Sequence, residues 1–383
     1  MRKMKTFLVE YDQVILFIVA ILTLFGLFLQ LNIGSSLGDN RQMNFFINQL
    51  KWVFISLPFF IFFFRYSKVI DLLYKFSFVF IIILIALLVM VLVKGISIQG
   101  GTRWIRIFGF TIQPSTLAHP ALIIFFAKFL EKKRDVIKDT GIAGFIKNFW
   151  FLILVSAIVF LLIALGRHLS TLIVLGLTLF TMLFVAEFKF SLFIILILLL
   201  GGFLYFYISD GAAYRLKRIE IYSKYSLFLK ALGYQRTEIE ADDYQVRESL
   251  TAISRGGLTG TGITRGRAKH KYLPDINSDY VFALIAEQFG FIGSLITVFL
   301  YCIFIFRVFL ISSYADSFFK KLLIFGFGAN LFITVLVNVG VSISALPSTG
   351  LPLPFISYGG SYLLTSLVMV GIILNVSSKR KSV

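Results

Sequence analysis

The stretch that decides the fold is Tyr272-Leu-Pro-Asp-Ile-Asn-Ser-Asp-Tyr-Val-Phe-Ala-Leu-Ile-Ala-Glu-Gln-Phe-Gly290, where a long polar segment gives way to a long apolar one. Asp279 lies at that junction, on the boundary between water and hydrocarbon. A carboxylate at a membrane edge is costly to desolvate and tends to be functional. The alternative is that Asn277, Ser278 or Asp279 only caps the helix that begins here. The surrounding sequence has to decide between these two interpretations.

The composition indicates a polytopic membrane protein. Of the 383 residues, 58% are hydrophobic and only 15% are charged, whereas soluble domains are about half apolar and about a quarter charged. The net charge of +18 fits topogenic lysines and arginines at the inner membrane surface. No nucleic-acid-binding motif accompanies that charge, so nucleic acid is not an expected partner. The single cysteine, Cys302, excludes an intrachain disulfide and a cysteine metal cluster.

Apolar runs long enough to cross a bilayer recur along the chain and predict an all-α polytopic fold with about ten transmembrane helices. We expect these helices at about 13–33, 48–65, 76–94, 113–130, 149–165, 168–186, 189–208, 280–309, 320–343 and 359–377. The run at about 280–309 is long enough to tilt or bend. No soluble domain or internal repeat interrupts the series, so residues 1–383 indicate a single membrane domain.

The short loops set the expected orientation, because lysine and arginine concentrate in cytoplasmic loops. Placing both termini in the cytoplasm puts most basic residues of the short loops on one side. They include Arg65, Lys68, Lys75, Lys128, Lys132, Lys133, Arg134, Lys138, Lys147, Lys320 and Lys321. The polar stretch of about 209–278, between helices seven and eight, then becomes a large extracytoplasmic loop. Long loops are largely exempt from the charge rule, so its own basic residues do not contradict this orientation.

The extracytoplasmic loop is too long to be an idle connection. Helical spacing at Tyr244–Arg255 precedes a glycine series: Gly256, Gly257, Gly260, Gly262 and Gly266. Glycines there permit tight turns or a close approach of the backbone to a ligand. Four cations follow at alternate positions, namely Arg265, Arg267, Lys269 and Lys271. In an extended chain they would point to one side and form an anion cradle; the alternative is a solvated charge run attracted to lipid headgroups.

Two further places carry polar groups at membrane depth. The first joins Gly101-Thr-Arg-Trp-Ile-Arg106 to Gln113-Pro-Ser-Thr-Leu-Ala-His-Pro120, where Pro120 would kink a helix. The second is the proline- and glycine-rich stretch 338–361, which cannot form one helix. Such backbone is tolerated near a membrane only against protein or a cavity. With His168 and Asp279, these places predict one outward-facing polar cavity; the alternative for the second place is an irregular plug without chemistry.

Several stretches resemble the SEDS family of bacterial cell-wall polymerases, which includes the FtsW and RodA proteins. They are Gly101-Thr-Arg-Trp-Ile105, Gln113-Pro-Ser115, Tyr244-Gln245 with the glycine series, Tyr272–Ala283, and Leu353-Pro-Phe-Ile-Ser-Tyr-Gly-Gly-Ser361. The resemblance covers nearly the whole chain and is closer to the division branch than to the elongation branch. It implies a peptidoglycan glycosyltransferase of the bacterial cytoplasmic (inner) membrane, which polymerises lipid II at the outer face in cell division or cell-shape maintenance.

The resemblance also implies roles for individual residues. Asp279 occupies the position of the proposed catalytic aspartate, and a carboxylate can act as general base on a sugar hydroxyl. Undecaprenyl pyrophosphate would leave, stabilised by cationic side chains or by a divalent cation, for which the sequence identifies no ligands. The expected substrate-binding residues are Arg103, Trp104, Gln113, Ser115, His119, His168, Arg255, Arg265, Arg267, Lys269, Lys271, Glu287, Ser357, Tyr358, Gly359 and Gly360. The expected partners are a class B penicillin-binding protein, other division or elongation proteins, and membrane lipids.

The sequence departs from the family pattern at two places. The family usually has Gln-Pro-Ser-Glu-x-x-Lys, and here Thr116 and His119 replace the glutamate and the lysine. It usually has Gln-Pro-Asp-Leu-Gly-Thr, and here His168 stands at the aspartate. We expect the two histidines to form a hydrogen-bonded pair in place of an ion pair. The missing carboxylate puts any mechanism with two carboxylates in doubt.

Two functions other than polymerisation stay open at this point. One is a lipid II flippase or transporter, which should carry polar residues through the membrane midplane. The other is a non-catalytic scaffold for division proteins, which would keep the fold without needing Asp279. The polar groups of this sequence crowd toward the outer side, which favours the enzyme.

Overall fold

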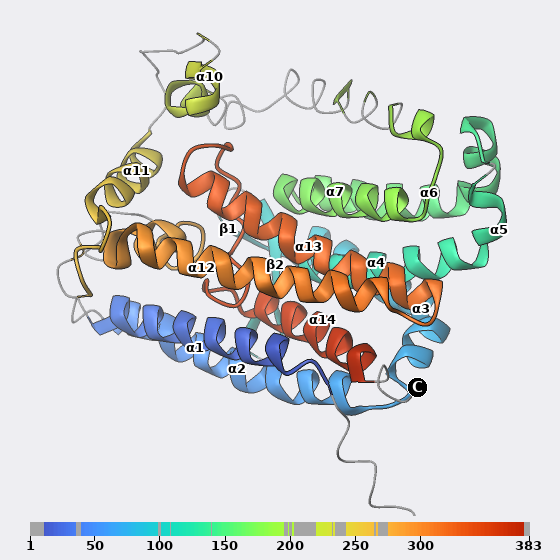
Figure 1. Ribbon diagram of the computed structural model, residues 1–383, viewed down its shortest axis with the longest axis horizontal. Helices are drawn as coiled ribbons and strands as arrows, with labels where there is room; N and C mark the ends of the chain where they lie inside the picture. The colour runs from blue at the N-terminus through green and yellow to red at the C-terminus, as the bar shows by residue number, and fades with distance from the viewer. Residues whose placement is uncertain are drawn as a thin grey trace, which may run out of the picture.

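The computed structural model describes residues 11–35, 40–98, 101–107, 109–138, 140–194, 198, 201–202, 220–231, 233, 243–263, 266 and 275–378. Within them the chain has a mostly helical, polytopic membrane fold (Figure 1). The longer helices are α1 (Gln13–Ser35), α2 (Asn40–Arg65), α3 (Val69–Lys94), α4 (Pro114–Lys132), α6 (Ile142–Leu165), α7 (Leu169–Val185), α11 (Tyr244–Gly256), α12 (Val281–Ser313), α13 (Phe318–Ser342) and α14 (Gly360–Ser378). Two short helices are α5 (Arg134–Ile137) and α10 (Leu227–Ala231).

Each predicted span except the one at about 189–208 coincides with a described helix. Seven of the described helices are long and apolar enough to cross a membrane, namely α1, α2, α3, α6, α12, α13 and α14. Helices α4 and α7 occupy the fourth and sixth predicted spans, and α7 is a shorter apolar helix of 17 residues. Most of the predicted span at about 189–208 lies outside the described residues.

Helices α13 and α14 form the centre of the bundle. In their candidate spans 72% and 83% of the residues are buried, against 22–39% in the other five spans. The outer helices instead expose large apolar side chains such as Phe17, Leu24 and Phe54. Soluble monomers rarely expose extended apolar surfaces, whereas a lipid-facing helix must. Burial therefore separates a protein-facing centre from a lipid-facing ring.

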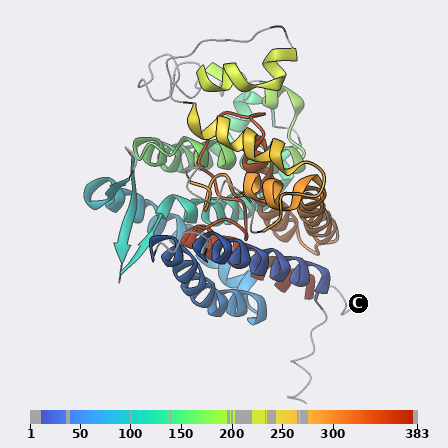
Figure 2. The same ribbon diagram turned by 90° about the vertical axis from the view of Figure 1, so that its left-hand side faces the viewer.

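A small antiparallel sheet lies between α3 and α4, so the prediction of an all-α chain is wrong at this point. Its strands are β1 (Ile96–Ile98), β2 (Gly101–Ile107) and β3 (Phe110–Ile112), in the order β1-β2-β3. In the register, Ile96 faces Trp104 and Ile105 faces Ile112. β-Branched and aromatic side chains favour strands. Figure 2 shows the strands at one side of the helical bundle.

The two ends of the described chain meet at one end of the bundle. The Asp12 N–H donates to Ser377 Oγ at 3.2 Å. Asn375 Nδ2 donates to the carbonyls of Phe64 and Tyr66 at 2.8 and 3.0 Å. These carbonyls belong to the C-terminal end of α2, where a helix has no partners of its own for them. The start of α1, the end of α2 and the end of α14 are therefore neighbours.

A break in α12 joins the described part of the 209–278 loop to the bundle. Gly290 has φ 67° and ψ −164° inside this helix, a conformation that residues with a side chain rarely adopt. The carbonyls of Glu287 and Gln288 near the break accept hydrogen bonds from the N–H groups of Thr261 and Gly262 at 2.9 and 3.1 Å. The expected bend in this helix is confirmed, and its freed carbonyls bind the loop.

Two members of the glycine series make this contact possible. A Cβ atom on Gly256 would lie 1.9 Å from the carbonyl oxygen of Ala286, and one on Gly260 would lie 2.2 Å from that of Gln288. Both separations are far below van der Waals contact. The sequence predicted a close approach of the backbone at these glycines. At Gly256 and Gly260 the loop backbone approaches the backbone of α12.

We predict that Gly256→Ala destabilises the protein, because the added methyl group cannot fit against a backbone carbonyl. Overpacking of this kind costs about 1–3 kcal/mol. The measurement is the apparent melting temperature of the purified protein in detergent. The matched control is Gly176→Ala in α7, where a Cβ atom would lie 3.9 Å from Phe160 Cε2. Equal melting temperatures for the two variants would contradict the packing argument.

Candidate functional site

Asp279 lies in a turn directly before α12. The N–H groups of Ser278 and Asp279 donate to the carbonyl of Asp275 at 3.1 and 3.0 Å. The N-cap residue of α12 is Tyr280, one position after Asp279, and the Tyr280 side chain makes no capping hydrogen bond. The interpretation of Asp279 as a helix cap is therefore not supported. Its half-buried side chain lies instead against the α13–α14 connection, where a Cβ atom on Gly350 would be 3.2 Å from Asp279 Oδ2.

Hydrogen bonds from two other parts of the chain hold the carbonyls of this turn. Gln30 Nε2, from α1, and the Tyr358 N–H donate to the carbonyl of Asn277 at 3.0 and 2.7 Å. Ser357 Oγ donates to the carbonyl of Ser278. Gln30 is fully buried in an apolar helix. The backbone before Asp279 is thus fixed by side-chain and main-chain donors, two of them from the predicted site residues Ser357 and Tyr358.

Asn338 of α13 fastens the same turn to the α13–α14 connection. Its Nδ2 donates to the carbonyls of Asp279 and Leu351 at 3.0 and 2.7 Å. Asn338 is buried, with 1% of its surface exposed. Leu351 is the residue after Gly350. Because one amide binds the carbonyls of both Asp279 and Leu351, it fixes the distance between the Asp279 turn and the α13–α14 connection. Asn338 begins the stretch 338–361 that the sequence placed at the site. Gln30 was not expected there, although a lone amide in an apolar helix is a usable signal.

A second polar cluster joins α4 and α7. His168 Nδ1 lies 2.9 Å from Ser115 Oγ, 3.1 Å from Gln113 Nε2 and 2.8 Å from Thr171 Oγ1. The Gln113 N–H donates to Ser361 Oγ at 3.0 Å. The structure therefore brings the predicted site residues Gln113, Ser115 and His168 together and links them to the start of α14.

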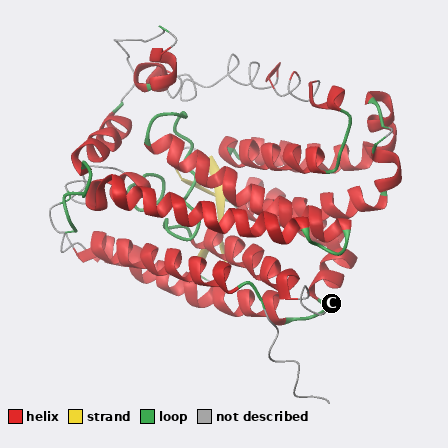
Figure 3. Cartoon of the chain, viewed as in Figure 1, coloured by secondary structure: helices red, strands yellow, loops and turns green. Residues whose placement is uncertain are grey.

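The connection between α13 and α14 (green in Figure 3) runs between the two polar clusters. Near its middle it contacts Asp279 through Gly350, and Ser170 of α7 donates to the carbonyl of the adjacent Thr349. At its C-terminal end Gly360 packs against Trp52, since a Cβ atom there would lie 2.0 Å from the indole Nε1. This irregular backbone is packed against protein, as membrane burial requires. The predicted outward-facing cavity stays a prediction.

His119 lies outside the His168 cluster. Its Nδ1 is 2.8 Å from Nδ2 of Asn330 on α13, and the same Nδ2 lies 3.2 Å from Thr178 Oγ1. The predicted hydrogen bond between His119 and His168 is therefore wrong. The reason is geometric: four residues along α4 from Ser115, His119 lies about one helical turn deeper in the bundle.

The other predicted binding residues belong to elements other than the Asp279 turn. Arg103 Nη2 donates to the carbonyl of Arg167 at 2.7 Å, which ties β2 to the turn before His168. Trp104 is half-buried on the same strand, Glu287 is buried on α12, and Arg255 is exposed at the end of α11. The cations Arg265, Arg267, Lys269 and Lys271 lie outside the described residues.

Comparison with known proteins identifies the family. The model of the FtsW, RodA and SpoVE cell cycle proteins matches residues 12–382. The chain belongs to this family. Among similar members are the probable peptidoglycan glycosyltransferase FtsW of Geobacter metallireducens, 33% identical over 292 residues (75% of this chain and 72% of the relative), and the stage V sporulation protein E of Bacillus subtilis, 35% identical over 289 residues (75% and 74%). The resemblance noted from the motifs is confirmed.

Solved structures of the FtsW/RodA/SpoVE fold agree with this assignment. One is a chain from a study of how a peptidoglycan synthase complex coordinates polymerization and crosslinking; it is 23% identical, with a TM-score of 0.76 over 98% of this chain and 99% of that chain. Another is the rod shape determining protein RodA of Thermus thermophilus, 24% identical, with a TM-score of 0.67 over 98% and 99%. At these identities the likeness is one of fold.

We predict that Asn338→Leu loosens the Asp279 turn, because it leaves two buried carbonyls without their donor. Each buried unsatisfied group costs about 1–3 kcal/mol. Hydrogen–deuterium exchange should rise in peptides that cover residues 275–282 and 346–353. The matched control is Asn330→Leu on the same helix, whose amide bonds His119 and Thr178 instead. Unchanged exchange in both peptides of the Asn338 variant would contradict the assignment.

Proposed function

We propose that this protein is a peptidoglycan glycosyltransferase that polymerises lipid II into glycan strands at the outer face of the bacterial cytoplasmic membrane. The observation that carries the proposal is the placement of Asp279. In a chain whose FtsW/RodA/SpoVE match spans residues 12–382, this carboxylate is half-buried and lies against Gly350, on a turn held by three other segments. Relatives named as glycosyltransferases support the reaction type.

In the proposed reaction Asp279 acts as general base. It accepts the proton of an acceptor sugar hydroxyl as that oxygen attacks the anomeric carbon of a lipid-linked sugar. The new carbon–oxygen bond forms as the bond from the anomeric carbon to the pyrophosphate oxygen breaks, and undecaprenyl pyrophosphate leaves. A fixed backbone serves this step because a base must be within hydrogen-bond reach of the proton it removes.

The charge on the departing pyrophosphate needs cations. Arg265, Arg267, Lys269 and Lys271 are the proposed source, since they follow the loop that docks on α12. A divalent cation at the pyrophosphate is the alternative source. No group of three or more His, Cys, Asp or Glu side chains suited to a metal occurs in the part of the chain that the structure describes.

An apolar cavity of about 260 Å³ between α2, α3, α4 and α14 suits the lipid part of the substrate. Phe63, Leu84 and Leu117 line it, and Thr365 is the one polar side chain among its lining residues. Ile83, another lining residue, is 50% exposed on the outside of the bundle. We place part of the isoprenoid chain here, because a carrier lipid can enter from the bilayer without crossing water.

The proposal includes a topology and a partner. Ten helices cross the membrane, both termini face the cytoplasm, and the 209–278 loop lies outside; the contact between Asp12 and Ser377 supports termini on one side. A class B penicillin-binding protein is the proposed partner, together with other division or elongation proteins. One structurally similar chain comes from a synthase complex that couples polymerization to crosslinking, which supports this choice.

Lipid II transport is the second candidate, and one observation favours it. His119, Asn330 and Thr178 form a buried polar cluster within three helices of the bundle. Buried polar groups at membrane depth are costly and often mark a transport path. A scaffold role, the third candidate, would need neither this cluster nor Asp279.

We predict that Asp279→Asn lowers polymerisation about 10²–10⁴-fold, the range that a general base contributes. The assay uses the purified protein with its penicillin-binding partner and labelled lipid II, and flipping is measured in liposomes. The nearly isosteric variant should still insert and bind its partner. The matched control is Asp275→Asn, at an exposed carboxylate in the same turn. Glycan synthesis near the wild-type level by the Asp279 variant would refute the general-base role, and flipping without polymer would favour transport.

A further inference from the structure

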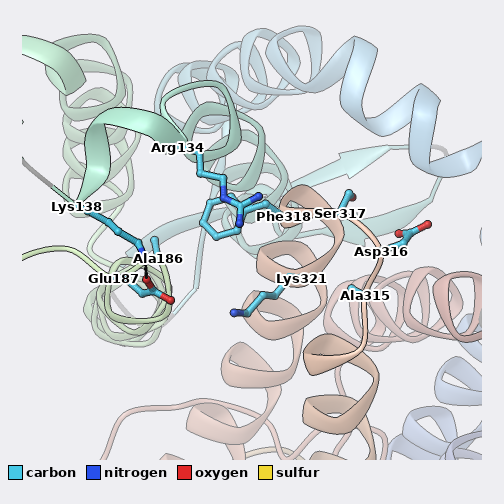
Figure 4. A pocket seen from close by; sticks show the side chains of 9 residues that line it. All are labelled: Arg134, Lys138, Ala186, Glu187, Ala315, Asp316, Ser317, Phe318 and Lys321. Carbon is cyan, nitrogen blue, oxygen red and sulfur yellow. Dashed lines mark ion pairs between the residues drawn. The ribbon is translucent and has the colours of Figure 1, made fainter.

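A polar cavity, distinct from the apolar one described above, lies at the end of the bundle opposite α11. It has a volume of about 280 Å³ and forms where α5, the end of α7 and the connection from α12 to α13 meet (Figure 4). Figure 1 shows α5 and α11 at opposite ends of the molecule. The cavity is therefore remote from Asp279 and takes no part in the proposed transfer reaction.

Each carboxylate that lines this cavity already has a lysine partner. Lys138 Nζ lies 2.8 Å from Glu187 Oε2, and Lys320 Nζ lies 2.6 Å from Asp316 Oδ2. The two carboxylates, Glu187 and Asp316, lie on different sides of the cavity (Figure 4). The two negative charges are thus compensated by cations other than those considered next.

Arg134 and Lys321 are the surplus cations. The Arg134 guanidinium carbon is 4.8 Å from the centre of the Phe318 ring, a cation–π contact that positions the group without neutralising it. Within the described ranges of the chain neither side chain forms an ion pair. The pKa of Glu187 is lowered first by the Lys138 hydrogen bond and charge, and further by the charges of Lys321 and Arg134. The positive charges of Arg134 and Lys321 therefore both reach the cavity at Glu187.

Large apolar side chains near Glu187 in the sequence are exposed. Phe184 and Phe190, three residues before and after Glu187, are 64% and 73% exposed. A basic cavity with exposed phenylalanines within three residues of one of its lining residues matches a ligand with an anionic head and hydrocarbon tails. Membrane surfaces provide such ligands, and basic pockets at helix ends bind their phosphate groups.

We propose that this cavity binds the headgroup of an anionic phospholipid, with the phosphate between Arg134 and Lys321 and the acyl chains along Phe184 and Phe190. A guanidinium gives two parallel donors to phosphate oxygens, and the lysine adds a point charge. The cavity volume leaves room for a headgroup larger than the phosphate alone. Bound lipid would join α5, α7 and α13 and stabilise this end of the bundle.

The test is thermal unfolding of the delipidated full-length protein, titrated with phosphatidylglycerol or with phosphatidylcholine. A ligand that binds the folded state raises the melting temperature in proportion to its affinity. We expect phosphatidylglycerol to stabilise the wild type and the Arg134→Gln/Lys321→Gln variant to bind it about tenfold or more weakly. The control is Lys132→Gln/Lys133→Gln, which removes the same charge from exposed residues outside the cavity lining.

Two further measurements distinguish a specific lipid site from attraction to general surface charge. Lys321→Arg should keep the phosphatidylglycerol response, and both double variants should melt alike in phosphatidylcholine if folding is intact. Equal phosphatidylglycerol affinity of the two double variants would overturn the proposal, because general surface charge would then account for binding. Stabilisation by inorganic phosphate alone, with no added effect of phosphatidylglycerol, would also overturn it.

Discussion

Non-helical backbone inside a membrane bundle must find hydrogen-bond partners within the protein. Two such segments meet here, the turn at residues 275–280 and the connection between α13 and α14. Asn338 donates to both of them, and Ser357 of the connection donates to the turn. The rest of the site depends on these hydrogen bonds between the two segments, because neither segment has the regular backbone hydrogen bonds of a helix. The hydrogen bonds that satisfy the backbone carbonyls of the turn also fix the position of Asp279.

The same constraint explains how the loop is attached. Gly290 breaks α12 and releases carbonyls that a continuous helix would have used. The backbone of residues 261–262 takes up these carbonyls, and Gly256 and Gly260 allow the approach. The helix that follows Asp279 therefore also carries the docking site for the loop.

Hydropathy located the membrane-spanning helices, because a helix that crosses the bilayer needs a long run of apolar residues, which the sequence shows directly. The motifs located Asp279 and the Gln113–Ser115–His168 cluster. The partners of those residues could not be predicted in the same way. Gln30 bonds the carbonyl of Asn277, 247 residues away, and no local pattern records such a contact.

The errors have the same physical origin. His119 and His168 were expected to pair, yet the depth of each residue in the bundle decides which groups it meets. Asn330, on a third helix, takes the place expected for His168 as partner of His119. The sheet at residues 96–112 was missed because its strands are short and lie among longer apolar runs. Local sequence favours strands there, but only pairing makes a sheet.

If Asp279 is the general base, the polymerisation rate depends on the fit between its carboxylate and the α13–α14 connection. The most direct measurement compares the polymerisation rates of Gly350→Ala and Gly109→Ala. Both glycines have positive φ, 73° and 83°, so both substitutions strain the backbone alike. A Cβ atom on Gly109 meets nothing within 4 Å, whereas one on Gly350 lies 3.2 Å from Asp279 Oδ2. Displacing a catalytic group slightly is costly, so the rate should fall about tenfold or more in the Gly350 variant only. Equal rates in the two variants would contradict the account.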